Sequence, residues 1–313
     1  MHLYARTIGL SEISTKSAMD ILLNKIIESA INNNCIIYDT KNSVQGDWME
    51  AQINHSMLKR QTGFTFEDMG GLCIRGLYNP KERLFEQSFY FPYIKGIKPR
   101  FNSQLLVERQ ADKEAYMVHC NEPRREVSPI FFLKNIVDYL YYANKETVLA
   151  DKFVHLSALS TGGKIIFPIR QTKEQIEKCN AATNKRNQLV DMALQGDVQA
   201  IDDLTLGDYN LITNLFERLK KEDIYSIVNS SFIPSGLECD CYSVVGNILE
   251  IASYRNEVTG EEVYSMLLEC NDNIISVGIN KKDLHGMPQA GCRFVGKIWL
   301  QGYIDFMEMD SEH

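Results

Sequence analysis

Residues 236–254 read GLECDCYSVVGNILEIASY. From Cys241 onward the stretch is apolar and rich in Val, Ile and Tyr, which predicts one long strand ending near Tyr254. Gly246 lies inside this strand, where a glycine often marks a bulge or a sharp bend. A strongly bent first strand, which can count as two of the five strands, is typical of a small OB-like barrel. The stretch therefore predicts the architecture of everything that follows it.

Three more strands are expected after the first, at 263–270, 274–280 and 294–306. An Asn-Asp-Asn turn at 271–273 and an irregular crossing segment join them. Residues 237–313 therefore predict a small OB-like β-barrel with a loose acidic tail. Ile-Pro-Ser-Gly at 233–236 marks the clearest domain boundary before it.

Residues 1–170 predict a mixed domain of an antiparallel sheet and packed helices. Thr15 is placed to cap an amphipathic helix. Ser128, followed by a proline, predicts the start of a helix over 128–145. A Gly-Gly pair favours a hairpin within 153–169. Short strands are expected at 35–40, 71–80, 84–94, 104–110 and 115–121.

Residues 171–236 are expected to be a helical segment that docks on the first domain. Its first long helix ends at Gly196, because glycine readily takes the positive φ of a helix C-cap. Two further helical units follow. The predicted fold class is therefore α+β in three parts, at 1–170, 171–236 and 237–313.

The formal net charge of −8 lies in the C-terminal part. Residues 237–313 hold five basic and thirteen acidic side chains, whereas residues 1–236 hold equal numbers of each. Neutralising phosphates supplies most non-specific nucleic-acid affinity, so this distribution argues against a nucleic-acid partner. The sequence has no apolar run of the length that a secretory leader or a membrane span requires. We therefore expect a cytoplasmic protein without a membrane partner.

Eight cysteines are scattered over the chain, which argues against a disulfide framework. Cys239 and Cys241 are spaced C-x-C, whereas structural zinc sites use two C-x₂₋₄-C pairs. Cys270 and Cys292 would have to converge on them, which the sequence does not test. Asp240 between the pair would raise the thiol pKa values. We interpret the pair as the start of a strand and expect no metal and no cofactor.

Catalytic signatures are missing. STGGKIIF at 160–167 looks like a phosphate-binding loop, but the lysine is followed by isoleucine and the Walker spacing is absent. His119 and Cys120 are neighbours on a predicted strand, so they point to opposite faces. We favour a protein that is not an enzyme, and keep as an alternative an enzyme whose residues converge from distant positions.

Aromatic residues of the C-terminal part are the candidate binding residues: Tyr264, Trp299 and Tyr303. Exposed aromatic side chains on a small barrel stack on single-stranded bases when a basic groove runs beside them. The basic residues that would have to converge there are Lys281, Lys282, Arg293 and Lys297. The preferred interpretation is that the aromatic side chains pack within the chain. A third interpretation is that these aromatic side chains anchor a protein partner.

Three phrases resemble a known family: EDIYSIVNSSFIPSGLECDCYSVVGNI at 222–248, TGEEVYSMLLEC at 259–270 and GCRFVGKIWLQG at 291–302. They resemble the domain of unknown function 3881, a family of uncharacterised bacterial proteins, and RTIGLSEI at 6–13 is similar to its opening. The resemblance covers essentially the whole chain and implies a cytoplasmic bacterial protein. It implies no activity, so no site residues are carried over.

The sequence does not establish an activity. The leading expectation is a non-enzymatic cytoplasmic binding or adaptor protein with a protein partner, engaged partly through the C-terminal part. The absence of a catalytic signature and the acidic, aromatic-bearing terminal part motivate it. The alternatives are single-stranded nucleic-acid binding by the barrel and an enzyme with distant residues.

Overall fold

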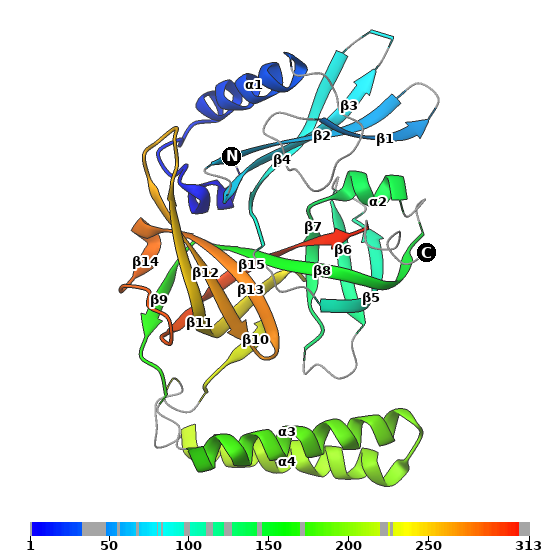
Figure 1. Cartoon of the computed structure of the whole chain (residues 1–313), viewed down its shortest axis with the longest axis vertical. Coiled ribbons are helices and arrows are strands. Elements are labelled where there is room, and N and C mark those ends of the chain that lie inside the picture. The colour runs from blue at the N-terminus through cyan, green and yellow to red at the C-terminus, as the bar shows by residue number, and fades with distance from the viewer. Residues whose placement is uncertain are drawn as a thin grey trace.

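The computed structural model describes residues 2–32, 48–54, 57–66, 69–79, 81–82, 84–96, 101–110, 115–121, 127–142, 146–169, 173–219, 225 and 228–306. The protein is α+β, as predicted, with a four-stranded sheet, a larger sheet of eleven strands and few helices (Figure 1). Within the described residues, no helix combines the length and apolar character needed to cross a membrane.

The four-stranded sheet is antiparallel, in the order β1 (Trp48–Asn54), β2 (Met57–Phe66), β3 (Gly70–Asn79) and β4 (Leu84–Ile94). The 3₁₀ helix η1 (Leu3–Ile8) and the helix α1 (Lys16–Asn32) precede it. The cap of α1 is confirmed, because the Ala18 N–H donates to the Thr15 hydroxyl at 3.2 Å. The helix shares a buried core with β3 and β4, which includes Met19, Leu23, Ile26, Leu72, Ile74 and Phe91.

The larger sheet contains β5 (Phe101–Arg109), β6 (Tyr116–Asn121), β7 (Ile130–Leu133), β8 (Val148–Ser160), β9 (Gly163–Ile166), β10 (Ser231–Pro234), β11 (Cys241–Arg255), β12 (Glu262–Cys270), β13 (Asn273–Asn280), β14 (Leu284–His285) and β15 (Arg293–Asp305). Two short helices accompany these strands, α2 (Ile136–Tyr142) and η2 (Lys281–Asp283). The pairing is not a simple ladder, because β8 and β11 each pair with β15 in addition to their other neighbours.

Strand pairing runs in two closed circuits. One passes through β11, β12, β13, β8 and β15 and returns to β11. The other passes through β8, β5, β6, β7 and β15 and returns to β8. The long strands β8 and β15 belong to both circuits, and Figure 1 shows them running between the two groups of strands.

The strands expected in the C-terminal part are present as β11, β12, β13 and β15. The strand that completes their circuit is β8, which lies before residue 170. β11 pairs with three strands: Cys241–Asn247 with β15, residues from Asn247 onward with β12, and Tyr242–Val245 with β10. Contacts between segments this distant leave no local pattern, so β8 could not be assigned to the circuit in advance.

The irregularity of β11 lies beyond the predicted glycine. Its register against β12 shifts between Ile248 and Glu250, which places the bulge at Leu249. Gly246 instead allows a close approach between strands. A Cβ atom there would lie 2.3 Å from the buried Sγ of Cys270. The interior glycine therefore permits close packing.

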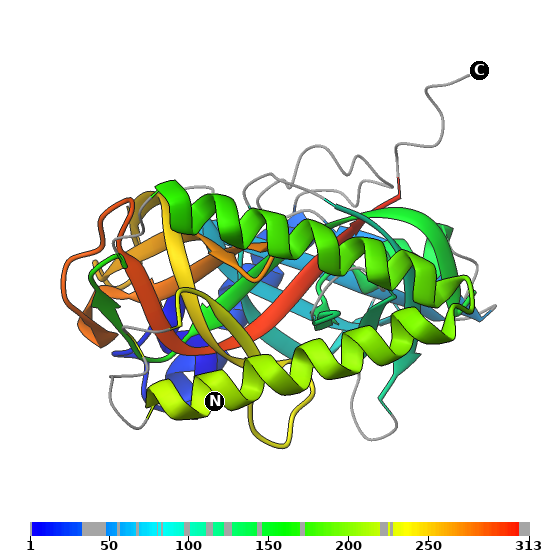
Figure 2. The same cartoon turned by 90° about the horizontal axis from the view of Figure 1, so that it is seen from below.

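A helical hairpin separates β9 from β10 and is made of α3 (Lys173–Leu194) and α4 (Val198–Leu219) (Figures 1 and 2). The predicted cap at Gly196 is confirmed, with φ of 90°. The Gly196 N–H donates to the Ala193 carbonyl at 3.0 Å and the Asp197 N–H to the Met192 carbonyl at 3.1 Å, which is a Schellman motif. Asp197 then caps α4 by accepting from the Gln199 N–H at 2.9 Å. The two helical units expected after Gly196 are one continuous helix.

Two predictions for the first 170 residues are wrong. The helix expected over 128–145 begins only at Ile136, because Phe131, Phe132 and Leu133 are all buried and lie in strand β7. The hairpin expected within 153–169 does not form, because β8 and β9 both pair with β15. The strand expected at 35–40 and the tail from 307 lie outside the described residues.

Two large buried clusters form most of the described core, and Ile136 and Val137 form a small third one. The larger of the two is made of side chains from both strand circuits. The other large cluster joins η1, α1, β3 and β4 to Phe132, Leu159 and Trp299 of the larger sheet, so the four-stranded sheet stacks on the larger one. The larger core joins strands from both sides of residues 170 and 236, while the division into three domains stays a prediction.

Candidate functional site

Trp299 is not exposed for binding. Its indole is buried, and Nε1 donates to Asp240 Oδ2 at 2.7 Å. The rings of His2, Tyr4 and Phe132 lie 5.0–5.2 Å from it, centre to centre. The N-terminal segment therefore covers this side chain. Burial lowers the pKa of His2 to about 4, so this ring contributes a neutral aromatic surface at neutral pH.

Tyr264 and Tyr303 are each half-buried and lie in different surroundings. Tyr264 packs against the larger core, and the Lys281 ammonium lies 5.9 Å from its ring centre. Tyr303 lies 6.3 Å from the ring of His155. Of the predicted aromatic and basic residues, the structure brings Tyr264 and Lys281 together.

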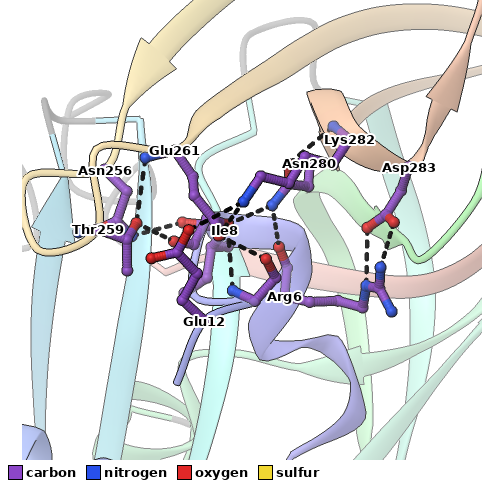
Figure 3. A network of polar contacts seen from close by, with 11 residues as sticks. Arg6, Ile8, Glu12, Asn256, Thr259, Glu261, Asn280, Lys282 and Asp283 are labelled. Atoms are coloured by element: carbon purple, nitrogen blue, oxygen red, sulfur yellow. Dashed lines mark hydrogen bonds and ion pairs between the residues drawn. The ribbon is translucent and has the colours of Figure 1, made fainter. Parts of the chain in front are cut away.

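The two adjacent lysines of η2 are paired with carboxylates. Lys281 Nζ lies 2.7 Å from Glu262 Oε2. Lys282 Nζ lies 2.9 Å from Glu261 Oε1 and 3.2 Å from Glu12 Oε1 (Figure 3). The hydrogen bonds to these carboxylates raise the pKa of both lysines. Both ammonium groups are therefore paired with carboxylates of the same chain, which weakens them as phosphate ligands.

Glu261 is the buried centre of the network in Figure 3. Its carboxylate accepts hydrogen bonds from the Ser11 hydroxyl at 2.5 Å, from Asn280 Nδ2 at 2.6 Å and from Lys282. Burial alone would raise the pKa of Glu261, but the bonds from Ser11, Lys282 and Asn280 outweigh it and lower the pKa. The carboxylate therefore holds the N-terminal segment against β12 and β13.

Further bonds fasten η1 to residues at the ends of β11 and β13 and to η2. Asn280 Nδ2 donates to the Arg6 carbonyl at 3.0 Å, and Asn256 Nδ2 donates to the Ile8 carbonyl at 2.8 Å. The Arg6 guanidinium forms a two-point ion pair with Asp283, which raises the Arg6 pKa (Figure 3). We call this set the N-terminal latch: Arg6, Ser11, Asn256, Glu261, Asn280, Lys282 and Asp283. Its groups are satisfied within the chain, so its role is structural.

Arg293 is a buried structural cation. Its guanidinium donates to the carbonyl oxygens of Phe167 at 3.0 Å, Val228 at 2.8 Å and Tyr225 at 2.7 Å. Phe167 precedes α3, and the other two residues follow α4. Of the four predicted basic residues, only Lys297 is exposed with no side-chain partner among the described residues. Lys281, Lys282, Arg293 and Lys297 therefore do not form a free basic patch.

A second set of buried cations lies between the two sheets, and the sequence analysis missed it. Arg75 Nη2 donates to the carbonyl oxygens of Leu133 at 2.8 Å and Lys134 at 2.7 Å. Lys134 Nζ donates to the Ile94 carbonyl at 2.9 Å and to the Ser157 hydroxyl at 2.8 Å. Part of the Lys134 residue reaches the surface, whereas its ammonium group is enclosed, and this burial lowers its pKa to about 7.

The available signal for this set was an arginine inside an apolar strand, GLCIRGL at 71–77. Every residue of β3 from Gly70 to Gly76 is buried. The guanidinium carbon of Arg75 lies 4.6 Å from the ring centre of Phe91 and 5.3 Å from that of Phe132. These contacts bridge the two sheets, so they give Arg75 and Lys134 a structural role.

The cysteine pair is the start of a strand, as interpreted. β11 begins at Cys241, and Cys239 lies exposed just before it. Burial first and Asp240 second raise the pKa of both thiols, so neither is an activated nucleophile. Among the described residues, no three His, Cys, Asp or Glu side chains lie close enough to hold a metal ion.

Among the described residues, the α3–α4 hairpin carries six exposed large apolar side chains. Two lie near the end of α3 and four between the start and the middle of α4: Met192, Leu194, Val198, Ile201, Leu206 and Tyr209. Val198 is 71% exposed and Tyr209 is 67% exposed. We call these six residues the hairpin face. Groups of exposed large apolar side chains on a soluble protein are typical of interaction surfaces.

Comparison with known proteins gives one match. Residues 5–302 match the family described as "Domain of unknown function, E. rectale Gene description (DUF3881)". Neither the curated proteins nor the solved structures contained a match. Because the match spans nearly the whole chain, the resemblance stated from the sequence is confirmed. The chain belongs to the DUF3881 family.

Proposed function

We propose that this protein is a non-enzymatic cytoplasmic binding or adaptor protein of a bacterium, and that the hairpin face contacts its protein partner. The observation that carries the proposal is the exposure of six large apolar side chains on one helical hairpin. A single exposed apolar residue is ordinary on a soluble protein, whereas a group of this size is costly unless something covers it.

The strand body acts as a platform in this proposal. The circuit of β11, β12, β13, β8 and β15 supports an OB-like barrel, because five strands close the pairing and the long strand β11 carries a bulge. Its predicted binding residues Trp299 and Arg293 are buried, and its lysines on η2 are paired with carboxylates. The binding surface is therefore assigned to the helices.

The test compares three baits of the full chain in lysate of the source cell, each with and without nuclease. The first is the unmodified protein. The second combines Val198→Ser, Ile201→Ser and Tyr209→Ser on the hairpin face. The third combines Leu237→Ser, Val258→Ser and Met287→Ser, which removes three exposed apolar side chains elsewhere.

We expect a discrete protein to be recovered by the first and third baits and lost by the second. Recovery of the same protein by all three baits would contradict the assignment of the surface. Recovery that disappears with nuclease would favour single-stranded nucleic-acid binding instead.

A further inference from the structure

The hairpin face lies within a stretch of sequence whose charged side chains are all negative. Residues 187–216 contain no Lys, Arg or His, and they contain five acids: Asp191, Asp197, Asp202, Asp203 and Asp208. All six apolar residues of the hairpin face lie inside this stretch. The exposed apolar side chains therefore belong to a segment whose charged residues are all acidic.

Helical spacing places an acid in the middle of the apolar side chains. Asp202 lies four residues after Val198 and four before Leu206, so the three share one side of α4. All three are exposed. Ala200, on the opposite side, is buried, and Leu204 is half-buried. One side of α4 thus packs inward, and the other presents apolar groups around a carboxylate.

The carboxylates differ in how they are used. Asp197 caps α4, and Asp203 accepts a bond from Gln199 Nε2 at 3.2 Å. Asp202 is exposed, and no side-chain bond to it is found among the described residues. Bonds to backbone N–H groups and to a neutral amide do not cancel charge, so Asp197 and Asp203 keep their negative charge.

We infer that the hairpin face binds a positively charged amphipathic helix of a protein partner, an inference that rests on the proposed function. An amphipathic helix lays its apolar stripe on an apolar surface, and Lys or Arg beside the stripe complements the carboxylates. A second copy of the chain would bring like charges together at the centre of the contact. Nucleic acid and anionic lipid surfaces carry the same sign as the face and would be repelled.

The test uses two synthetic amphipathic peptides of about 18 residues with identical leucine stripes at helical spacing. One carries lysine at every polar position and the other carries glutamate. Binding of each labelled peptide to the full chain is followed by fluorescence anisotropy at low and high salt. We expect the lysine peptide to bind at least about tenfold more tightly, and added salt to weaken it.

Matched variants locate the contact. Asp202→Asn with Asp203→Asn should weaken the lysine peptide several-fold. Glu250→Gln with Glu257→Gln removes the same charge from exposed positions on and after β11 and should leave binding unchanged. Equal binding of both peptides, or equal loss in both variant pairs, overturns the inference. Circular dichroism of each variant checks that the fold is retained.

The inference and the proposed function fail separately. If the Val198→Ser, Ile201→Ser, Tyr209→Ser protein loses its lysate partner while peptide charge has no effect, the function stands and the inference falls. If that protein keeps its partner, the proposed function falls. A dimer by light scattering that becomes a monomer in the same triple variant identifies a second copy as the occupant and overturns the inference.

Discussion

Arg293 on β15 donates a hydrogen bond from Nη2 to the carbonyl oxygen of Tyr225, at 2.7 Å. Tyr225 follows α4, and the same guanidinium also holds the carbonyl of Phe167, which precedes α3. The Lys164 ammonium lies 4.1 Å from the ring centre of Tyr225. Both ends of the helical hairpin are therefore tied to one buried cation on the strand body.

Replacing Arg293 with Met should loosen the hairpin on the body. The change removes three hydrogen bonds and leaves their carbonyl acceptors in a buried setting, so we expect a loss of roughly 2–4 kcal/mol in the free energy of unfolding. Urea unfolding measures the loss, and limited proteolysis should show faster cleavage near the ends of α3 and α4. Lys297→Met, on the exposed face of the same strand, is the control and should change stability by less than about 0.5 kcal/mol. An equal loss in the free energy of unfolding for both variants would contradict this structural role of Arg293.

Lys134 should make stability rise with pH. Burial first, and Lys95 as a like charge, lower its pKa from 10.5 to about 7 in the folded protein. Between these values the unfolded chain binds a proton that the folded chain does not, so the free energy of unfolding increases by up to about 1.4 kcal/mol per pH unit. Below about pH 7 both states are protonated and the slope vanishes.

The measurement is urea unfolding of the unmodified protein and of Lys134→Met from pH 7 to 10. The difference between the two curves isolates the lysine from the tyrosines and cysteines that also titrate. If the free energy of unfolding depends on pH in the same way for both proteins, the Lys134 ammonium is solvated rather than enclosed.

Glu261→Gln should release the N-terminal latch. The carboxylate has a folded pKa below 4.5, so its contribution is present above that pH and is lost as the pH falls through the folded pKa. We expect the variant to lose roughly 1–3 kcal/mol at pH 7 and to converge with the unmodified protein in acid. Hydrogen exchange of residues 3–11 should quicken. Glu262→Gln, which breaks only the exposed pair with Lys281, is the matched control and should cost less than about 1 kcal/mol.

Gly246→Ala should test the close approach of β11 to β12. The new Cβ would overlap the Sγ of Cys270 and lie 3.2 Å from Leu268 Cβ, so we expect a loss of roughly 1–3 kcal/mol. Combining it with Cys270→Ala should recover part of the loss, because the overlapping sulfur is removed. A double-mutant cycle of urea unfolding measures that coupling. Additive losses would mean that the strands move apart instead.

Local signals were sufficient for the elements that depend on a few neighbouring residues. The Thr15 cap and the Gly196 cap are both confirmed. The turn between β12 and β13 takes positive φ at Asn271 and Asp272, residue types that tolerate it. The chemistry of each lies within one turn of the chain, so the sequence alone carried the information.

Properties that arise from distant segments could not be predicted. Period-two alternation placed Trp299, Gln301 and Tyr303 on one side of a strand, but not what covers that side. The N-terminal segment and the four-stranded sheet cover it, so Trp299 and Gln301 are buried. The enclosure of Lys134 depends in the same way on β4 and β8, which meet only in three dimensions.

The sharing of β8 and β15 between both strand circuits has a kinetic consequence. Neither circuit closes until residues 148–160 and 293–305 have met, although more than a hundred residues separate them. Closing so long a loop costs entropy before either core is formed, which is typical of slow folding. We therefore expect the two circuits to melt in one cooperative transition and to refold on the timescale of the slowest β proteins.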